Sequence, residues 1–468
     1  MRYISTRGRA PALDFAGVLR AGLAEDGGLY VPEAWPRFSA AEIRALRGLT
    51  YPALAARVMA PFVGNAVPDL ARLTAAAYAD FAHPAVVPLV QLETGLFLLE
   101  LFHGPTLAFK DLAMQLLGRL FEDVLNGESV TIVGATSGDT GAAAIEALKD
   151  RRGITVAILH PEGRVSDVQR RQMTTVSAAN IGNIAIRGSF DDCQDLVKSM
   201  FADAAFRSEQ HLSAVNSINW ARIAAQIPYY FAASLALGAP DRTVAFSVPT
   251  GNFGNILAAW AALQMGLPIE RLVVACNQND ILARFLAAND MSLCPVRPSV
   301  SPSMDIQVSS NFERLLFELL DRDAAETERI MQGFRAAGRM AVPEAAWRRM
   351  GVLFQGFALD DAGTEAEIGR LWRTAGYLAD PHTAIGVAAA RARAPGRGVP
   401  MIAAATAHPA KFAPVVMRAC GVSPTLPARL ADLYERPERY TVEANDLAAV
   451  QADVRTLAAR NRAEGIKV

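Results

Sequence analysis

The stretch SVTIVGATSGDTGAAAIEALKD, residues 129–150, carries the pattern that decides the fold. Its first seven residues form a short apolar run with β-branched side chains, which predicts a buried strand. Its last ten residues predict a helix, and the small polar residues between the two predict a tight turn. A buried strand that leads through a short turn into a helix is typical of a parallel α/β sheet.

The same alternation continues on both sides of this stretch. Further strands are predicted at 95–102, 154–160, 180–188, 244–250, 271–277 and 399–406, and further helices at 111–125, 191–206, 220–236, 255–266, 383–394 and 410–421. Because the strands are apolar and separated by helices, we expect parallel sheets that are covered on both faces. The first ninety residues differ, since short helical segments alternate there with Gly and Pro breaks.

Composition excludes several classes of protein. The 468 residues are 51% apolar and 20% charged with a net charge of −1, so the chain has ample material for a core and no field that attracts nucleic acid or an anionic membrane. No segment reaches about 18 consecutive apolar residues, and the N-terminus lacks a signal-peptide core. The four cysteines form no C-x-x-C pair, so neither a metal site nor a disulfide framework is expected. We expect a cytoplasmic protein.

Three strand-to-helix junctions are rich in small polar residues: VGATSGDTGAAA (133–144), VPTGNFGNILAAW (248–260) and IAAATAHPAKF (402–412). The first two gather backbone N–H groups at a helix N-terminus, an arrangement that binds anions. The second lacks the Walker and G-x-G-x-x-G spacings, which disfavours a nucleotide site. One such junction is often an ordinary turn, but three in one α/β chain favour a ligand site at the carboxyl ends of the strands.

Lysine is rare in this chain. Only five of the 46 basic residues are lysines, namely Lys110, Lys149, Lys198, Lys411 and Lys467. Arginine supplies charge but does not form imines, so a lysine that persists can mark amine chemistry. Lys110 lies in FHGPTLAFKD (102–111), where apolar neighbours would lower the pKa of its amine. With a phosphate cradle and a carboxylate site, it suggests pyridoxal phosphate (PLP), bound to Lys110 as a Schiff base.

Nine motifs follow one another along the chain: ISTRG (4–8), DGGLYVPE (26–33), FHGPTLAFKD, GATSGDTGAAA, VNSINWARI (215–223), VPTGNFGN, SPSMDIQVSSNFERLLFEL (301–319), ADPHTA (379–384) and TAHPAKF. In this order they resemble the long-chain threonine synthases, PLP enzymes related in fold to the tryptophan synthase β subunit. The resemblance covers nearly the whole chain, from residue 4 to about residue 412. It implies a fold type II α/β enzyme with two open α/β domains and a mostly helical N-terminal domain.

The resemblance also implies roles for the residues around the cofactor. Lys110 would form the Schiff base and shuttle protons. Thr406 would hydrogen-bond the pyridine nitrogen, and Asp139, where related enzymes often carry Asn, would line the ring. The cofactor phosphate would be held by Gly251, Asn252, Phe253, Gly254 and Asn255.

The resemblance implies a second group of residues, which would bind the substrate. Ser137 and Thr140 would face its carboxylate. Its phosphate would be bound by Asn216, Ser217, Asn219 and Arg222, with Lys411 assisting. Arg222 is the natural phosphate partner because a guanidinium binds two oxygens at once.

The family reaction converts O-phospho-L-homoserine and water into L-threonine and phosphate by β,γ-elimination and hydration. We therefore expect a carbon–oxygen lyase that catalyses the last step of threonine biosynthesis. Its expected partner is the small-molecule substrate, with no nucleic acid and no membrane, and the expected state is a monomer. The expected domains are the N-terminal domain 1–90, a large PLP-binding domain formed by 91–124 and 213–430, a small mobile domain 125–212, and a C-terminal helical tail 431–468. Arg7, in the first motif, is expected in a surface ion pair.

Three other functions are left open by the residues. A phospholyase would use the same substrate but release 2-oxobutyrate and ammonia. A dehydratase or β-replacing synthase would act on serine or threonine, although Arg222 within a phosphate-binding set disfavours it. A non-catalytic PLP-binding homologue would bind the cofactor without turnover.

Overall fold

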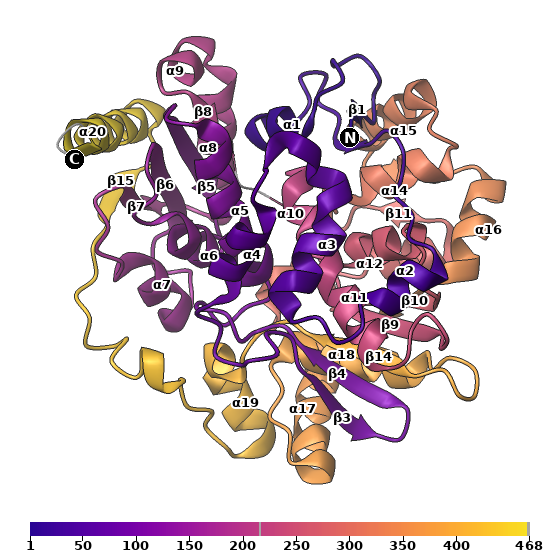
Figure 1. Cartoon of the computed structure of the whole chain (residues 1–468). Helices are drawn as coiled ribbons and strands as arrows, with labels where there is room; N and C mark the ends of the chain where they lie inside the picture. The colour runs from indigo at the N-terminus through magenta and orange to yellow at the C-terminus, as the bar shows by residue number, and fades with distance from the viewer. Residues whose placement is uncertain (215–216, 466–468) are drawn as a thin grey trace.

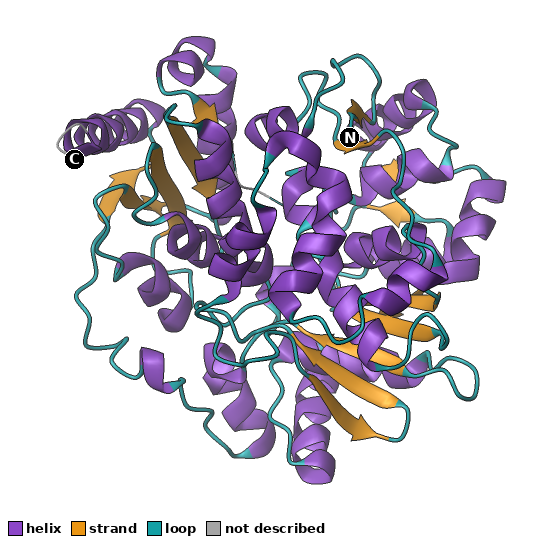
Figure 2. Ribbon diagram, in the orientation of Figure 1, coloured by secondary structure: helices purple, strands orange, loops and turns teal. Residues whose placement is uncertain are grey.

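The computed structural model describes residues 1–214 and 217–465 of the chain. Two open sheets lie on opposite sides of a layer of helices, the smaller sheet at the upper left of Figure 1 and the larger one at the lower right. Figure 2, with strands in orange, separates the two sheets clearly. The predicted α/β architecture is therefore present, and the chain passes between the two sheets more than once.

The larger sheet has six strands in the order β13-β10-β9-β14-β4-β3. All neighbours are parallel except β3, which pairs antiparallel with β4 at the edge. The central strands are buried along their whole length, which explains their continuous apolar sequence. The bounds are β3 Leu89–Glu93, β4 Leu96–Glu100, β9 Val244–Pro249, β10 Ile269–Cys276, β13 Phe354–Ala358 and β14 Met401–Ala405.

The smaller sheet has five parallel strands in the order β15-β7-β6-β5-β8. Their bounds are β5 Val130–Ala135, β6 Ile154–Pro161, β7 Ile181–Arg187, β8 Leu212–Ser213 and β15 Thr441–Ala444. The edge strand β15 comes from the C-terminal tail, and helix α20 (Leu447–Gly465) packs on β6 and β7. The tail, expected to be helical, thus adds a strand to this sheet (Figure 1).

The N-terminal segment contains a short antiparallel pair, β1 (Tyr3–Ser5) with β2 (Tyr30–Pro32), and four helices. The helices are α1 Phe15–Ala21, α2 Ala40–Ala45, α3 Tyr51–Val63 and α4 Leu70–Tyr78. Helices α3 and α4 pack on α11 and α5 of the central layer, and Tyr3 packs its ring on Trp220. This segment therefore shares one apolar core with the rest of the chain.

The remaining helices surround the sheets. Their bounds are α5 Lys110–Leu125, α6 Asp139–Leu148, α7 Asp167–Thr174, α8 Phe190–Ala202, α9 Ala204–Glu209, α10 Trp220–Ala224, α11 Ile227–Ala236, α12 Gly254–Gln264, α13 Ile281–Ala288, α14 Phe312–Leu319, α15 Ala324–Ala337, α16 Glu344–Leu353, α17 Asp361–Ala375, α18 Pro381–Ala392 and α19 Ala413–Cys420. A short antiparallel pair, β11 (Met291–Ser292) with β12 (Arg339–Met340), completes the fold. Within the described residues, no helix is both long and apolar enough to cross a membrane.

Two long helices predicted from the sequence are each divided in two. The helix expected over 191–206 breaks at Asp203, which leaves helical geometry and caps α9 by accepting a hydrogen bond from the Phe206 amide. The helix expected over 220–236 breaks before α11, where Pro228 has no N–H to continue the hydrogen-bond ladder of α10. The helix expected over 410–421 begins with a 3₁₀ turn, Pro409–Phe412, before α19.

Candidate active site

Lys110 is the first residue of α5, and the turn before it is held by the next side chain along the helix. The buried Asp111 carboxylate accepts hydrogen bonds from the Thr106 amide at 2.8 Å and the Thr106 hydroxyl at 2.5 Å. Gly104 is required there, because a Cβ would lie 2.4 Å from the Asp111 Cβ. Burial raises the pKa of Asp111 to about 6, against the lowering effect of the Thr106 hydrogen bond.

The approach to Lys110 is also fixed by the third junction, after β14. The Phe109 amide donates to the Thr406 carbonyl at 2.9 Å, and the His408 amide donates to the Leu107 carbonyl at 3.0 Å. Thr406 is buried at the carboxyl end of β14. The structure therefore brings Lys110 and Thr406, 296 positions apart in the numbering, to adjacent backbone segments.

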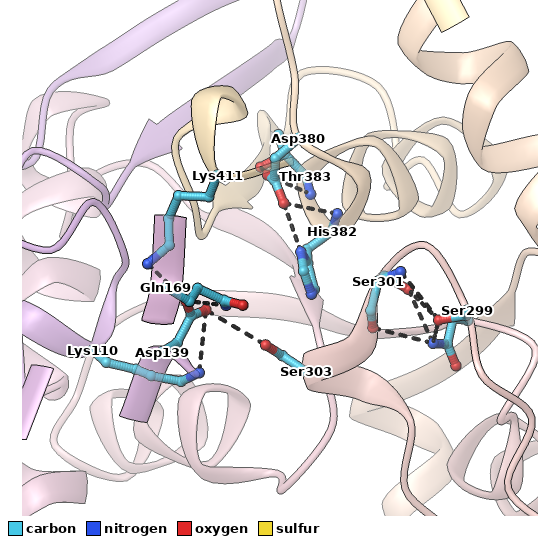
Figure 3. Close-up of polar contacts among 11 residues, drawn as sticks. Lys110, Asp139, Gln169, Ser299, Ser301, Ser303, Asp380, His382, Thr383 and Lys411 are labelled. Atoms are coloured by element: carbon cyan, nitrogen blue, oxygen red, sulfur yellow. Dashed lines mark hydrogen bonds and ion pairs between the residues drawn. The ribbon is translucent and has the colours of Figure 1, made fainter. Parts of the chain in front are cut away.

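Asp139, the first residue of α6, joins the smaller sheet to the site. Its carboxylate lies 3.4 Å from the Lys110 Nζ and 2.7 Å from the Lys411 Nζ. It also accepts hydrogen bonds from the Gln169 amide at 2.7 Å and the Ser303 hydroxyl at 3.5 Å. Figure 3 shows these four side chains converging on the carboxylate from separate parts of the chain.

The charges in this cluster act on one another strongly because they are buried. Burial alone would raise the pKa of Asp139, but Lys411 and Lys110 outweigh it and hold that pKa well below its usual range. Burial lowers the pKa of the Lys110 amine; Asp139 opposes this effect, while Arg222 and Lys411 add to it. An amine with a lowered pKa is unprotonated more often and is a better nucleophile and base.

The second junction, 251–255, forms a cradle of backbone between β9 and α12. Phe253 adopts the left-handed conformation with φ 62°. Among the described residues, no side chain caps the first turn of α12. Its first N–H groups are therefore left for another acceptor. A Cβ on Gly251 would lie 2.7 Å from the Ser303 carbonyl, so only glycine fits. The Asn255 Nδ2 is buried with no hydrogen-bond partner among the described residues.

The residues after Ser309 hold this cradle from outside. The Ser309 hydroxyl donates to the Gly251 carbonyl at 2.8 Å, and the Ser310 hydroxyl donates to the Asn252 Oδ1 at 3.1 Å. The Asn311 side-chain amide donates to the Asn252 carbonyl at 3.0 Å. These contacts bind oxygens of the cradle, and among the described residues no acceptor is bound to the backbone N–H groups of 251–255, which can therefore face an anion.

The N-terminal segment contacts α14, the helix that follows Ser309–Asn311. Arg7 and Glu313 form an ion pair of 3.0 Å between the Arg7 Nη2 and the Glu313 Oε2, with both side chains about 5% exposed. The Thr6 hydroxyl donates to the same carboxylate at 2.7 Å. The expectation that Arg7 lies in a surface ion pair was wrong about its burial, because β1 packs inside the enzyme and turns Arg7 toward α14.

The residues predicted to bind substrate are placed differently from one another. Ser137 is exposed and Thr140 is half-buried at the start of α6. Arg222 is buried in α10 and lies close enough to Lys110 to lower the pKa of its amine. Ser217 lies 3.2 Å from Ser310, hydroxyl to hydroxyl. Asn216 lies outside the described residues.

Two predicted substrate residues have other partners in the structure. The Asn219 amide donates to the Leu19 carbonyl at 2.9 Å, and its Oδ1 accepts from the Ala221 amide at 3.0 Å, so this side chain caps α10. The Lys411 Nζ, which is fully buried, donates to the Thr106 carbonyl at 2.8 Å besides its contact with Asp139.

The three family models that match the chain cover most of its length. The threonine synthase N-terminus matches residues 2–78, the pyridoxal-phosphate dependent enzyme family residues 83–341, and the threonine synthase C-terminal model residues 383–454. The threonine synthase of Pseudomonas aeruginosa is 56% identical, and the alignment covers 97% of this chain and 98% of that protein. The chain belongs to the threonine synthase family.

Solved structures agree with this assignment. A PLP-bound threonine synthase from Brucella melitensis has a TM-score of 0.96 and 53% identity, over 98% of this chain and 99% of that one. The yeast threonine synthase has a TM-score of 0.92 and 37% identity, over 98% and 99% of the two chains. The predictions of fold type II, of PLP and of a threonine synthase are confirmed.

The site fits PLP on its own geometry. The cradle at 251–255 offers N–H groups and the orphaned Asn255 amide to a phosphate, and Lys110 offers an amine of lowered pKa. Thr406 would meet the ring nitrogen with a hydroxyl. When bound, PLP supplies an electron sink that stabilises negative charge at the substrate Cα.

The residues that contact Asp139 or the cradle include five that were absent from the predicted set: Gln169, Ser303, Ser309, Ser310 and Asn311. Four of them lie in the motif 301–319, which was quoted for the family resemblance, so this motif was the available signal. Gln169 lies in α7 within an ordinary polar sequence, and its role follows only from the packing of α7 on α6.

Proposed function

We propose that the enzyme converts O-phospho-L-homoserine and water into L-threonine and phosphate. One observation carries the proposal: three cationic side chains, Lys110, Arg222 and Lys411, share a buried region with two carboxylates, Asp139 and Asp111. A substrate with both a phosphate and a carboxylate brings the negative charge that such a site needs. Membership of the threonine synthase family supports the same substrate.

We assign the chemistry to residues as follows. Lys110 removes a proton from the substrate Cα and returns protons later, since it is the amine of lowered pKa beside the cofactor cradle. Gly251–Asn255 hold the cofactor phosphate, and Thr406 hydrogen-bonds the ring nitrogen. Because a hydroxyl need not protonate that nitrogen, the position of Lys110 has to direct each proton transfer.

The substrate is held at its two anionic ends. Arg222 and Ser217, with Asn216, bind the departing phosphate, and Ser137 with Thr140 binds the carboxylate at the N-terminus of α6. Asn219 supports this set by capping α10, the helix that carries Arg222. Water then has to add at Cβ while the site excludes it elsewhere, because premature release yields 2-oxobutyrate.

We propose that the smaller sheet and its helices, residues 125–212, form a mobile unit that closes over the substrate. The tail residues of β15 and α20 would move with it, because they pack on β7 and β6. Residues 91–124 with 213–430 would form the static PLP-binding domain, and 1–90 an N-terminal domain that packs against it through a shared apolar core. We further propose a cytoplasmic monomer, to be checked by light scattering coupled to size-exclusion chromatography.

A product analysis tests the proposed function. The purified enzyme is incubated with O-phospho-L-homoserine while phosphate, threonine and 2-oxobutyrate are followed. We expect one threonine for each phosphate, abolished in Lys110→Ala and kept in Lys198→Ala, whose side chain is exposed on α8. Phosphate matched by 2-oxobutyrate would replace the synthase by a phospholyase. Turnover of serine or threonine without phosphate release would point to a dehydratase.

A further inference from the structure

We propose that Lys411 is a positioning residue: its buried ammonium is the nearer ion-pair partner of Asp139, so that Asp139 does not pair with the Lys110 amine alone. The inference rests on the proposed role of Lys110 at the cofactor. It replaces the expectation that Lys411 assists in binding the substrate phosphate.

The geometry places Lys411 on Asp139. The Lys411 Nζ lies 2.7 Å from the Asp139 Oδ1, whereas the Lys110 Nζ lies 3.4 Å from the Asp139 Oδ2. The Lys411 side chain is 0% exposed, and Lys110 is 12% exposed. A fully buried ammonium is costly unless it is paired and hydrogen-bonded, and Asp139 with the Thr106 carbonyl provides both.

The position of Lys411 is set by backbone. It lies in the 3₁₀ turn Pro409–Phe412, where its amide donates to the His408 carbonyl at 3.1 Å. The His408 ring accepts a hydrogen bond from the Ala410 amide at 3.2 Å and so caps this turn. The ammonium therefore extends from the larger sheet to a carboxylate that belongs to the smaller sheet (Figure 3).

The charges explain why Lys110 needs this partner. The charged groups that act on its amine are Asp139, which favours the protonated form, and Arg222 and Lys411, which oppose it. Without Lys411, the strongest remaining partner of Asp139 would be Lys110 itself. An ion pair formed by Asp139 with Lys110 alone would favour the protonated form of Lys110. A protonated amine neither attacks an aldehyde nor removes a proton.

Lys411 also gives Asp139 a partner when Lys110 has lost its proton. Lys110 loses its charge whenever it gives up a proton, and Asp139 would then be a buried carboxylate with two neutral donors, Gln169 and Ser303. Lys411 at 2.7 Å keeps the carboxylate ionised and oriented through both states of Lys110.

The test follows uptake of PLP by the apoenzyme as a function of pH, in the absence of substrate. Bond formation with the cofactor aldehyde requires the unprotonated amine, so the midpoint of the rate profile reports the pKa of Lys110. In Lys411→Met we expect the midpoint to rise by about one pH unit. In the double variant Asp139→Asn with Lys411→Met the midpoint should fall to the wild-type value or below it, because Asp139 favours the protonated Lys110 amine more strongly than Lys411 opposes it. Lys198→Met is the matched control and should not move it.

The outcomes separate positioning from packing and from substrate binding. A lower melting temperature in Lys411→Met with an unchanged midpoint would show that Lys411 only fills space and would overturn the proposal. A midpoint in the double variant that stays above the wild-type value would also overturn the proposal. Because the double variant removes both members of the Lys411–Asp139 pair, it keeps the proposal testable if Lys411→Met alone fails to fold. If Lys110→Ala still showed the absorbance of a Schiff base between PLP and the protein, the role of Lys110 on which the inference rests would be overturned, whatever product the wild type forms.

Discussion

The two glycine-rich junctions of the molecule have similar sequences but opposite construction. At 136–141 in the smaller sheet, the Thr136 hydroxyl accepts hydrogen bonds from the Gly138 amide at 3.0 Å and the Gly141 amide at 2.8 Å. Two N–H groups of this junction, those of Gly138 and Gly141, are therefore bound within the junction itself, and the turn also carries the charged side chain of Asp139. At 251–255 in the larger sheet, neighbours bind the carbonyls and leave the N–H groups available.

A Gly-rich turn at the end of a strand is therefore not in itself a phosphate site. What decides is whether the N–H groups of the turn already have acceptors in the protein. Near the second junction, Arg7 of the N-terminal segment pairs with Glu313, which follows two residues after Asn311. Three substitutions and one pH experiment test the difference between the two junctions.

Arg7→Met should have the largest effect. It leaves the buried Glu313 carboxylate without its cation, which we expect to cost about 3–5 kcal/mol of stability. Because Glu313 lies beside the residues that hold the cradle, PLP affinity should fall as well. Arg2→Met, an exposed arginine near Glu33, is the control. Melting temperature and PLP titration measure the two effects, and a stable variant with full affinity would separate the N-terminal segment from the cradle.

Gly251→Ala should damage the cradle directly. Its Cβ would lie 2.7 Å from the Ser303 carbonyl, so one of the two backbones has to move. We expect PLP affinity to fall by about 100-fold, equal to about 2.7 kcal/mol. Gly351→Ala, where no atom lies within 4 Å of the added Cβ, should bind PLP normally. Equal affinities in the two variants would disprove the assignment of the cradle.

Thr136→Val should affect the other junction in the opposite way. It removes the acceptor of two buried amides, which we expect to cost about 2 kcal/mol of stability. Affinity for PLP should change little, since this junction holds no cofactor phosphate. Thr456→Val, at an exposed position of α20, serves as control. A large loss of PLP affinity at unchanged stability would reverse the roles of the two junctions.

The smallest expected effect is on the loss of folding stability at low pH, which should differ between variants of the two junctions. The pKa of Asp139 lies well below its unfolded value of 3.8, because Lys411 and Lys110 outweigh burial. The ionised carboxylate therefore stabilises the fold above about pH 4, and this stability is lost as the pH falls further. Calorimetry between about pH 5 and pH 3 should show a shallower loss in the Asp139→Asn, Lys411→Met double variant, by about 1–2 kcal/mol. Gly251→Ala should keep the slope of the wild type.

Local sequence predicted most of the regular structure. The strand over 129–135 and the helix after it lie within two residues of β5 and α6, because an apolar β-branched run and an alanine-rich segment each favour one structure. Breaks that depend on one residue were missed, at Asp203 and before Pro228. The strand β15 was also missed, since the sequence TVEA becomes a strand only by pairing with β7.

The site was predictable where a residue type is tied to a chemistry. Lys110 and Asp139 stand out as a rare lysine and an acidic residue in a Gly-rich turn, and the structure brings them together. The partners that hold them, such as Gln169 and Asn311, are ordinary polar residues whose contacts arise from packing between distant segments. Burial was the other gap, because neither Arg7 nor Lys411 shows in its sequence context that its charge is enclosed.

A crystal structure of the enzyme loaded with PLP tests the division between the two junctions most directly. We predict that the cofactor phosphate lies against the N–H groups of Gly251–Asn255, that continuous density joins the cofactor to the Lys110 Nζ, and that Lys411 stays on Asp139. A phosphate bound at 136–141, or a covalent bond to Lys411 in place of Lys110, would contradict this account.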